Sequence, residues 1–286
     1  MAFKKTLTIL ATAIMLAACA DDAPKNEQTH AAPVASEPVA ASVVAQNANL
    51  PTLRVVTDAT YPPFASKDKN GQIEGLDVDL FTAVARNQGY NVQFVPHDWE
   101  GIFKTLANDT ADVVVSAVSE TDESLAAADL SDSYYHTPYR IAALEPAKFD
   151  LKDWATQAKI AISNTEDSSV DLPERYKVKK EQLVIRDSVF LALQEVAKGN
   201  AQVVVADSTV LQYYIASPTF KDHNIKFVSQ NLPAGRGSDI VYAVKKGNKD
   251  LLGKINKGLA NIKANGEYEK ILNKWNQSLP TANAAK

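Results

Sequence analysis

The chain contains two series of short apolar strands that alternate with amphipathic helices, one beginning at Leu53 and the other near Lys159. Strand, helix and strand joined by short connections form a mostly parallel sheet with helices packed on its faces. Two such series within about 230 folded residues imply two lobes of about a hundred residues each. The sequence therefore predicts a two-lobed α/β protein.

The period of the apolar residues places the elements of each series. In the first series we expect strands at Leu53–Thr57, Asn91–Val95 and Asp112–Val115, a helix opening at Gly75 with Asp77 as its N-cap, and a helix over Gly101–Ala107. In the second series we expect strands at Ile160–Ile162, Leu183–Ile185 and Val203–Val205, and helices at Ser188–Lys198 and Ser208–Ser217. A further strand at Asp239–Val244 and two helices at Lys249–Asn265 and Gly266–Leu279 close the chain.

Polar residues follow directly after two of the most apolar strands. Val113–Val115 runs into a serine-rich turn at Ser116–Ser119, and Asp207 follows Val203–Val205. Ligands of open α/β sheets bind at the carboxyl ends of the strands, so these residues are candidates for ligand contact. Asp207 can also cap the helix that begins at Ser208, and the two roles are compatible.

Several stretches resemble the polar amino-acid solute-binding proteins of ABC transporters, the family 3 type of periplasmic binding protein. These stretches are LRVVTDATYPPF (Leu53–Phe64), GLDVDLFTAVA (Gly75–Ala85), WEGIFKTLANDTADVVVSAVS (Trp99–Ser119), DLSDSYY (Asp129–Tyr135), VVVADSTVLQYYI (Val203–Ile215) and GEYEKILNKW (Gly266–Trp275). The resemblance implies a type II periplasmic-binding-protein-like fold with two crossing strands as the hinge. Lobe 1 would be Leu53–Ala142 with Arg236–Leu279, and lobe 2 would be Glu145–Ala234.

The resemblance also implies an aromatic wall. In the family, the residues that match Tyr61 and Trp99 sandwich the ligand side chain, and the residue that matches Asp58 can face a basic side chain. Each has a structural alternative, because Trp99 could anchor a core and Asp58 could cap a turn.

The ligand loop implied by the resemblance contains Ser116, Ala117 and Ser119. Residues that match the two serines bind the α-carboxylate and α-ammonium of an amino acid, and the residue that matches Asp207 receives the α-ammonium. A ligand with both groups would therefore lie between this loop and Asp207.

Two regions of the sequence, one in each lobe, depart from the family pattern. The family has an arginine five residues beyond the second serine that binds the ligand carboxylate, whereas this chain has Ser124 there and the acidic Glu120 directly after Ser119. In the second lobe, Thr165 and Glu166 stand where a glycine-containing turn grips the carboxylate. We expect Glu120, Ser124, Thr165 and Glu166 to be ligand-contacting positions of changed chemistry.

Three explanations of the departures remain open. The ligand could be a cation without a carboxylate, such as a polyamine, bound by Asp58, Glu120 and Asp207. It could be an amino acid whose carboxylate is held by backbone N–H groups at Ser119 to Thr121 and by another arginine such as Arg236 or Arg140. The third explanation is that solute binding has been lost.

The function expected from the resemblance is a receptor that binds a polar, cationic amino acid or related amine and delivers it to an inner-membrane ABC permease. The alternative is an enzyme on the same scaffold, similar to cyclohexadienyl dehydratases, with Glu120 or Glu166 as general acid. We expect no enzyme activity, because those enzymes also use an arginine for the substrate carboxylate and Ser124 stands in its place here. We also expect no cofactor, and no metal because His30, His97, His136 and His223 lack metal-like spacing. Nucleic acid is an unsuitable partner for a chain of net charge −4.

The first 18 residues predict a lipoprotein signal peptide. Lys4 and Lys5 precede an apolar segment over Leu7–Leu16, and the only cysteine, Cys19, follows small residues as in a lipobox. Residues 19–52 are expected to be a disordered tether and 280–286 a tail. The expected product is a monomer, lipid-anchored at Cys19 in the periplasm or on the extracytoplasmic face of a bacterial membrane.

Overall fold

The computed structural model describes residues 47–147, 150–164, 172–235 and 237–276, all within one compact unit. The expected signal peptide, Cys19, the tether up to residue 46, Thr165, Glu166, Arg236 and the tail lie outside the described residues. No helix in the described ranges is long and apolar enough to cross a bilayer.

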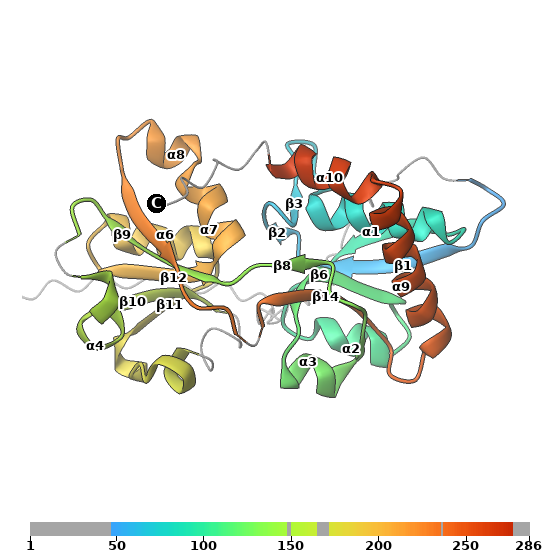
Figure 1. Cartoon of the computed structure of the whole chain (residues 1–286), viewed down its shortest axis with the longest axis horizontal. Helices are drawn as coiled ribbons and strands as arrows, with labels where there is room; N and C mark the ends of the chain where they lie inside the picture. Colours follow the sequence, from blue (N-terminus) through green and yellow to red (C-terminus); the bar gives the residue numbers. More distant parts are fainter. Residues whose placement is uncertain (1–46, 148–149, 165–171, 236, 277–286) are drawn as a thin grey trace, which may run out of the picture. The chain divides into compact units, whose positions relative to one another are not determined.

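The first lobe is built on a mixed sheet in the order β5-β1-β6-β14-β7, with β8 also paired to β14 (Figure 1). Its strands are β1 (Thr52–Thr57), β5 (Asn91–Pro96), β6 (Val113–Ser119), β7 (Asp129–Leu130), β8 (Tyr135–His136) and β14 (Asp239–Val244). β1 pairs parallel with β5 and β6, whereas β14 is antiparallel to β6, β7 and β8. The expected parallel core of this sheet is therefore joined by an antiparallel returning strand.

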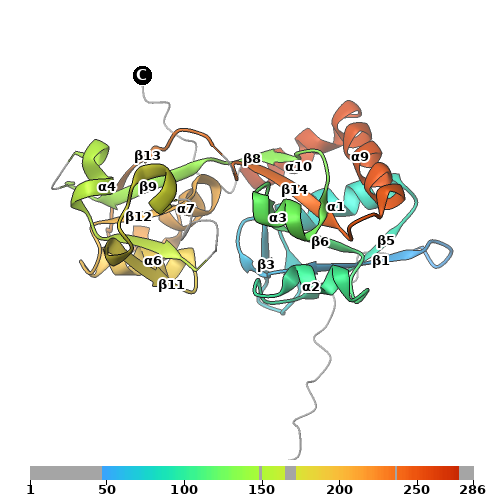
Figure 2. The same ribbon diagram turned by 90° about the horizontal axis from the view of Figure 1, so that it is seen from below.

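Helices cover both faces of this sheet (Figures 1 and 2). They are α1 (Leu76–Asn87), α2 (Ile102–Ala107), α3 (Asp122–Ala127), α9 (Lys249–Ala264) and α10 (Glu267–Asn276), and a small sheet of β2 (Thr60–Tyr61), β3 (Ala65–Lys67) and β4 (Ile73–Glu74) adjoins α1. Val113 and Val115 pack in the core on the α1 and α9 side, and Val114 packs with α2. A strand buried on both faces needs apolar residues at every position, which explains the run of valines.

The second lobe is built on a sheet with the strand order β11-β10-β12-β9-β13. As in the first lobe, the first parallel strand of the lobe, β10, lies between the second, β11, and the third, β12. Its elements are β9 (Tyr139–Leu144), β10 (Ile160–Ser163), β11 (Leu183–Arg186), β12 (Val203–Asp207), β13 (Phe227–Asn231), α4 (Trp154–Gln157), α6 (Val189–Ala197), α7 (Ser208–Ile215) and α8 (Pro218–Lys221), with 3-10 turns at Leu151–Asp153 and Lys180–Gln182. β10 pairs parallel with β11 and β12, and β9 pairs antiparallel with β12 and β13. The topology thus shows two lobes of the same design.

The first crossing between the sheets lies earlier than the sequence indicated. We expected lobe 1 to extend to Ala142, but β9 begins at Tyr139 and forms its hydrogen bonds within the second sheet. The chain therefore crosses at residues 137–138 and returns between β13 and β14. An apolar strand gives no local sign of which sheet it joins, and this explains the error.

β6 is a bulged strand rather than a strand followed by a turn. Val114 lies opposite Ala243 and Val118 opposite Val241, so Val115–Ala117 face the single Tyr242. Ala117 has a φ of 44°, a left-handed conformation that few non-glycine residues adopt. The bulge turns the backbone of Ser116 and Ala117 at the carboxyl end of the sheet.

The sequence suggested Asp77 as the N-cap of α1, but this prediction was wrong, because Gly75 occupies the N-cap position. The Asp77 side chain is fully buried and accepts hydrogen bonds from Tyr134 Oη (2.5 Å) and Ala117 N (2.7 Å). Burial raises the pKa of Asp77 to about 6, although both hydrogen bonds oppose the shift. The side chain holds the bulge of β6 to the first turn of α1.

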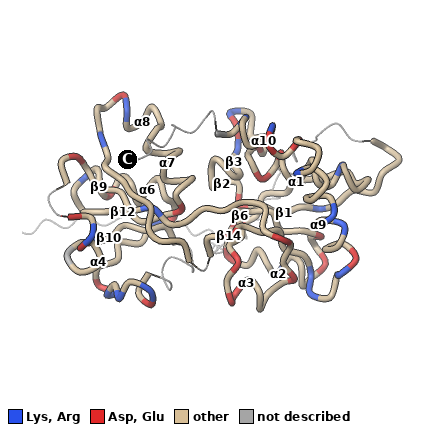
Figure 3. Tube along the Cα trace, viewed as in Figure 1, with Lys and Arg blue, Asp and Glu red and all other residues tan. Residues whose placement is uncertain are grey.

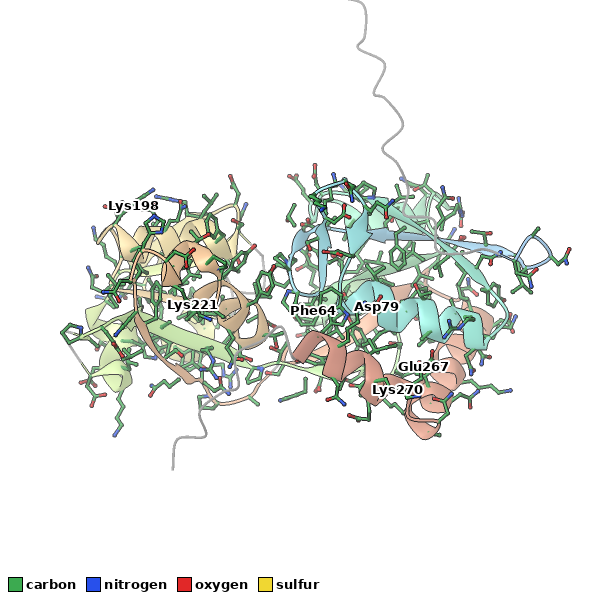
Figure 4. The ribbon with its side chains drawn as sticks, turned by 90° about the horizontal axis from the view of Figure 1, so that it is seen from above. Phe64, Asp79, Lys198, Lys221, Glu267 and Lys270 are labelled. Carbon is green, nitrogen blue, oxygen red and sulfur yellow. The ribbon has the colours of Figure 1, made fainter. Side chains whose placement is uncertain are left out.

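The last helix, α10, is held to α1 by polar contacts with Asp79, which lies near the start of α1. Asp79 Oδ2 accepts hydrogen bonds from Lys274 Nζ (2.6 Å) and Trp275 Nε1 (2.8 Å) on α10. Arg86 also pairs with Glu267, and Figure 4 shows Asp79 and Glu267 on their respective helices. The end of the chain is therefore an integral part of the first lobe.

The helix pair α1 and α9 gives a test of this packing. A Cβ on Gly258 of α9 would lie 2.8 Å from the carbonyl oxygen of Val84, whereas a Cβ on Gly253 of the same helix would have no atom within 4 Å. We expect Gly258→Ala to lower the free energy of unfolding by about 1–3 kcal/mol through overpacking. Gly253→Ala should raise it by about 0.5–1 kcal/mol through helix propensity. Urea unfolding measures both, and equal effects of the two substitutions would contradict the close packing.

Candidate functional site

A cavity of about 120 Å³ is lined by residues from both sheets and from both crossing segments. Its lining residues are Asp58, Thr60, Tyr61, Trp99, Ser116, Ala117, Ser119, Thr137, Tyr139, Ser163, Asn164, Asp187, Ser188, Asp207, Gly237 and Ser238. Most of them lie at or just beyond the carboxyl ends of β1, β6, β10, β11 and β12. This is where ligands of α/β sheets bind.

Seven of the residues singled out in the sequence line this cavity. They are Asp58, Tyr61, Trp99, Ser116, Ala117, Ser119 and Asp207. Glu120 and Ser124 are not among the lining residues, and Thr165 and Glu166 fall outside the described part of the chain. The cavity therefore brings together the first-lobe strand ends and Asp207.

Asp207 combines the two roles that the sequence left open. Its Oδ1 accepts hydrogen bonds from Thr209 N (2.8 Å) and Val210 N (3.1 Å), which caps α7, and from Thr137 Oγ1 (2.8 Å). The side chain is 9% exposed and lines the cavity. Burial raises the pKa of Asp207 to about 7, against the effect of these hydrogen bonds. In the described structure the hydrogen bonds to this carboxylate all end on Oδ1, so Oδ2 is available to a ligand.

The serine-rich end of β6 is tied to neighbouring elements. Ser116 Oγ accepts a hydrogen bond from Asp58 N (2.9 Å) across the two strand ends. Ala117 N donates to the buried Asp77, so the backbone of the bulge is held in place. The Asp58 carboxylate accepts hydrogen bonds from Thr60 N and Thr60 Oγ1, which confirms its turn-capping role while it lines the cavity.

Ser124 does not point into the cavity. It is 3% exposed, and its Oγ accepts a hydrogen bond from Thr121 N (2.9 Å) and donates to the carbonyl oxygen of Ser119 (2.8 Å). Thr121 Oγ1 in turn accepts from Ser124 N, so the two residues form a capping box at the start of α3. The short side chain is used in helix capping, and this corrects its assignment as a ligand contact.

Glu120 also lies outside the main cavity. It lines a separate hollow together with Thr121, Leu125 and Asp239, and its backbone N–H donates to the carbonyl oxygen of Asp239 (2.9 Å). Glu120 is therefore not one of the residues that line the cavity.

The sequence interpretation missed Asp187 and Ser188. Both line the cavity, and they lie between β11 and α6, with Ser188 Oγ capping α6 by accepting from Leu191 N (3.3 Å). The signal was present, because Asp187 follows a predicted strand in the same way as Asp207.

The cavity lining carries negative charge. Three carboxylates, those of Asp58, Asp187 and Asp207, line it, and the described lining residues include no lysine or arginine. Lysines are instead frequent on α9 (Figure 3). Acidic side chains are thus the only ionisable groups of charge opposite to a cation among the described lining residues.

Arg140, a sequence candidate for holding a carboxylate, is engaged elsewhere. Its Nη1 donates to Ser229 Oγ (2.9 Å), and its Nη2 lies 2.6 Å from the Gln212 amide oxygen when that amide is oriented to accept. It does not line the cavity. The other candidate, Arg236, is outside the described residues.

The described residues contain no group of His, Cys, Asp and Glu side chains suited to hold a metal ion. The polar groups of the cavity are carboxylates, hydroxyls, one amide and an indole N–H. This set can bind a small solute through hydrogen bonds and charge.

Comparison with known proteins gives consistent matches over the folded part of the chain. A model described as "Bacterial extracellular solute-binding proteins, family 3" matches residues 53–278. The L-arginine-binding protein of Pseudomonas aeruginosa is 30% identical over 234 residues, covering 78% of this chain and 87% of that protein.

Solved structures agree with the family match. An ancestral arginine-binding protein, solved with arginine and with glutamine bound, is 33% identical with a TM-score of 0.66, and the match covers 78% of this chain and 97% of that one. The ancestral amino acid-binding protein AncCDT-1, a precursor of cyclohexadienyl dehydratase, is 30% identical with a TM-score of 0.64, covering 78% and 94%.

The capping box of α3 leads to a prediction that separates stability from binding. We expect Ser124→Ala to lower the free energy of unfolding by about 1 kcal/mol, because a helix-capping hydrogen bond is lost. The affinity for any ligand of the cavity should stay unchanged, since Ser124 does not line it. Chemical denaturation and titration calorimetry measure the two quantities. A large loss of affinity with unchanged stability would show that Ser124 does contact the ligand.

Proposed function

Because the chain belongs to the bacterial extracellular solute-binding proteins of family 3, we propose that it binds a small cationic solute for an ABC transporter. The solute is an amino acid or a related amine, bound in the cavity lined by both lobes. Most of the length of the arginine-binding relatives is matched, which supports a binding role for the whole folded part.

The observation that carries the proposed charge preference is the set of three carboxylates in the cavity lining, with no described lysine or arginine beside them. Asp207 is the most constrained of these, because it is buried and fixed by three hydrogen bonds. Opposite charges attract strongly in a partly desolvated site, whereas an anionic solute would be repelled.

Aromatic side chains add a second attraction for a cation. Tyr61, Trp99 and Tyr139 line the cavity. Trp99 packs edge-on against Phe103, with ring centroids 5.9 Å apart, and this contact restricts the orientation of the indole ring. A cationic or apolar part of the solute can lie against these rings.

The two crossing segments suit a hinge mechanism. Thr137 lies on the first crossing, and Gly237 and Ser238 lie on the second, and all three also line the cavity. A ligand that contacts both lobes and the crossing segments favours the arrangement in which all these groups reach it. Delivery to a permease would follow from recognition of that arrangement.

An enzymatic alternative receives no support from the residues that suggested it. Glu120, one of the two carboxylates considered as a general acid, lies outside the cavity. Glu166, the other, is not among the described residues. The relatives compared above bear names of binding proteins.

The cationic preference is tested by titrating the purified full-length chain with lysine, arginine and cadaverine, and with glutamate as an anionic control. We expect binding of the cations and none of glutamate. Asp207→Asn should weaken cation binding at pH 8 at least tenfold, because a hydrogen bond to a charged group is worth about 1.5–3 kcal/mol. Asp222→Asn, at the exposed residue that directly follows α8 and does not line the cavity, is the matched control and should change nothing.

The affinity for a cation should fall as the pH is lowered. A cation favours the ionised form of Asp207, whose pKa is about 7 in the free protein. Binding therefore releases a proton, and the dissociation constant should rise about tenfold per pH unit below 7, or roughly 100-fold at pH 5. Asp207→Asn should abolish this dependence. Equal affinity at pH 5 and pH 8 in the unsubstituted protein would argue against Asp207 as the ligand carboxylate.

We also propose that Cys19 is lipidated and that the body is tethered to a membrane. The support is the sequence around Leu16–Cys19 alone. Cys19→Ser should move the protein from the membrane fraction to the soluble fraction of bacterial cells expressing the full chain. Retention of the Cys19→Ser protein on membranes would contradict the lipid anchor.

A further inference from the structure

We propose that the solute carries positive charge at both ends and no carboxylate, which makes it a linear diamine or a guanidino amine rather than an α-amino acid. This inference rests on the proposed cation binding and narrows its ligand class. It follows from the fate of the groups that could hold a carboxylate and from the positions of those that could hold cations.

Three backbone donors at the carboxyl end of β6 and just beyond it are already used. Ala117 N donates to Asp77 Oδ2, Glu120 N to the carbonyl oxygen of Asp239, and Thr121 N to Ser124 Oγ. A carboxylate held at a loop needs converging free N–H groups. A carboxylate could therefore bind these three N–H groups only if the hydrogen bonds that hold the β6 bulge, the β6–β14 contact and the α3 cap were broken.

The arginines of the described chain are also committed. Arg54 pairs with Asp112, Arg86 with Glu267 and Arg186 with Glu195, while Arg140 binds Ser229. Arg175 Nη2 donates to the carbonyl oxygens of Pro233 (2.6 Å) and Ala234 (2.7 Å) on the second crossing segment.

None of these five arginines lines the cavity, and neither does any described lysine. Among the described residues, a ligand carboxylate would consequently meet only neutral donors, while Arg236 and residues 165–171 lie outside the described chain. The hydroxyls of the lining can accept hydrogen bonds from an ammonium as readily as they donate to a carboxylate, so they impose no preference for an acid.

The carboxylates are distributed over both lobes. Asp58 follows β1 of the first sheet, whereas Asp187 and Asp207 follow β11 and β12 of the second. A solute with one cationic group could neutralise one of them, and a carboxylate on the same solute would be repelled by the others. A solute with a cationic group at each end neutralises carboxylates from both lobes.

Matched pairs that differ only in the α-carboxylate test this inference. Full-length protein in detergent is titrated with cadaverine and lysine, putrescine and ornithine, and agmatine and arginine. We expect the amine of each pair that binds to be at least tenfold tighter than its amino acid. Amino acids that bind as tightly as the amines, or more tightly, overturn the carboxylate-free ligand but leave cation binding standing. No binding of either member in any pair overturns the proposed function itself.

A variant at the exposed rim of the cavity tests the two-ended contact. Asp187→Asn should weaken cadaverine binding at least tenfold and leave binding of the single-ended pentylamine within twofold of Asp222→Asn. Asp187 is exposed, so the substitution should preserve the fold, which the thermal midpoint checks. Cadaverine binding that is unaffected by Asp187→Asn, or an equal loss for both amines, overturns a two-ended contact that includes Asp187.

Discussion

The buried carboxylate of Asp77 is the contact on which the ligand side of the first lobe depends. It accepts hydrogen bonds from Ala117 N, in the bulge of β6, and from Tyr134 Oη. Tyr134 stacks on Tyr242 of β14, with ring centroids 4.1 Å apart. One side chain thus joins α1, the bulge and the returning strand, and it determines how the serine-rich end of β6 faces the cavity.

Burying this carboxylate is costly, and the raised pKa of Asp77, about 6, expresses that cost. An acid whose folded pKa lies above its unfolded value binds its proton more tightly when folded. This group therefore contributes most to stability below about pH 4, and its contribution falls as the pH rises toward 6. At neutral pH the two hydrogen bonds are what make the charged form tolerable.

Local patterns predicted most elements but not the contacts that orient the site. Apolar period and strand ends predicted the parallel strands, the helices, the turn at Ser116–Ser119 and Asp207, because these depend on short-range sequence. Asp58, Tyr61 and Trp99 were instead implied by the family resemblance. The role of Asp77, the bulge at Ala117 and the sheet to which β9 belongs depend on partners far away in the chain. Ser124 was recognised as a missing arginine, yet its capping role required knowing where its hydroxyl points.

The charges of the cavity and of the scaffold are coupled. Burial is the main reason that the pKa of Asp207 rises to about 7, and the negative charge of Asp77 raises it further. Asp77, which fixes the β6 bulge, therefore also disfavours the ionised form of Asp207 when no ligand is bound. In the proposed function, a cation that enters would replace the proton on Asp207 and offset the repulsion from Asp77. A solute carrying its own carboxylate would offset less of that repulsion, which agrees with the proposed preference for ligands with an excess of positive charge.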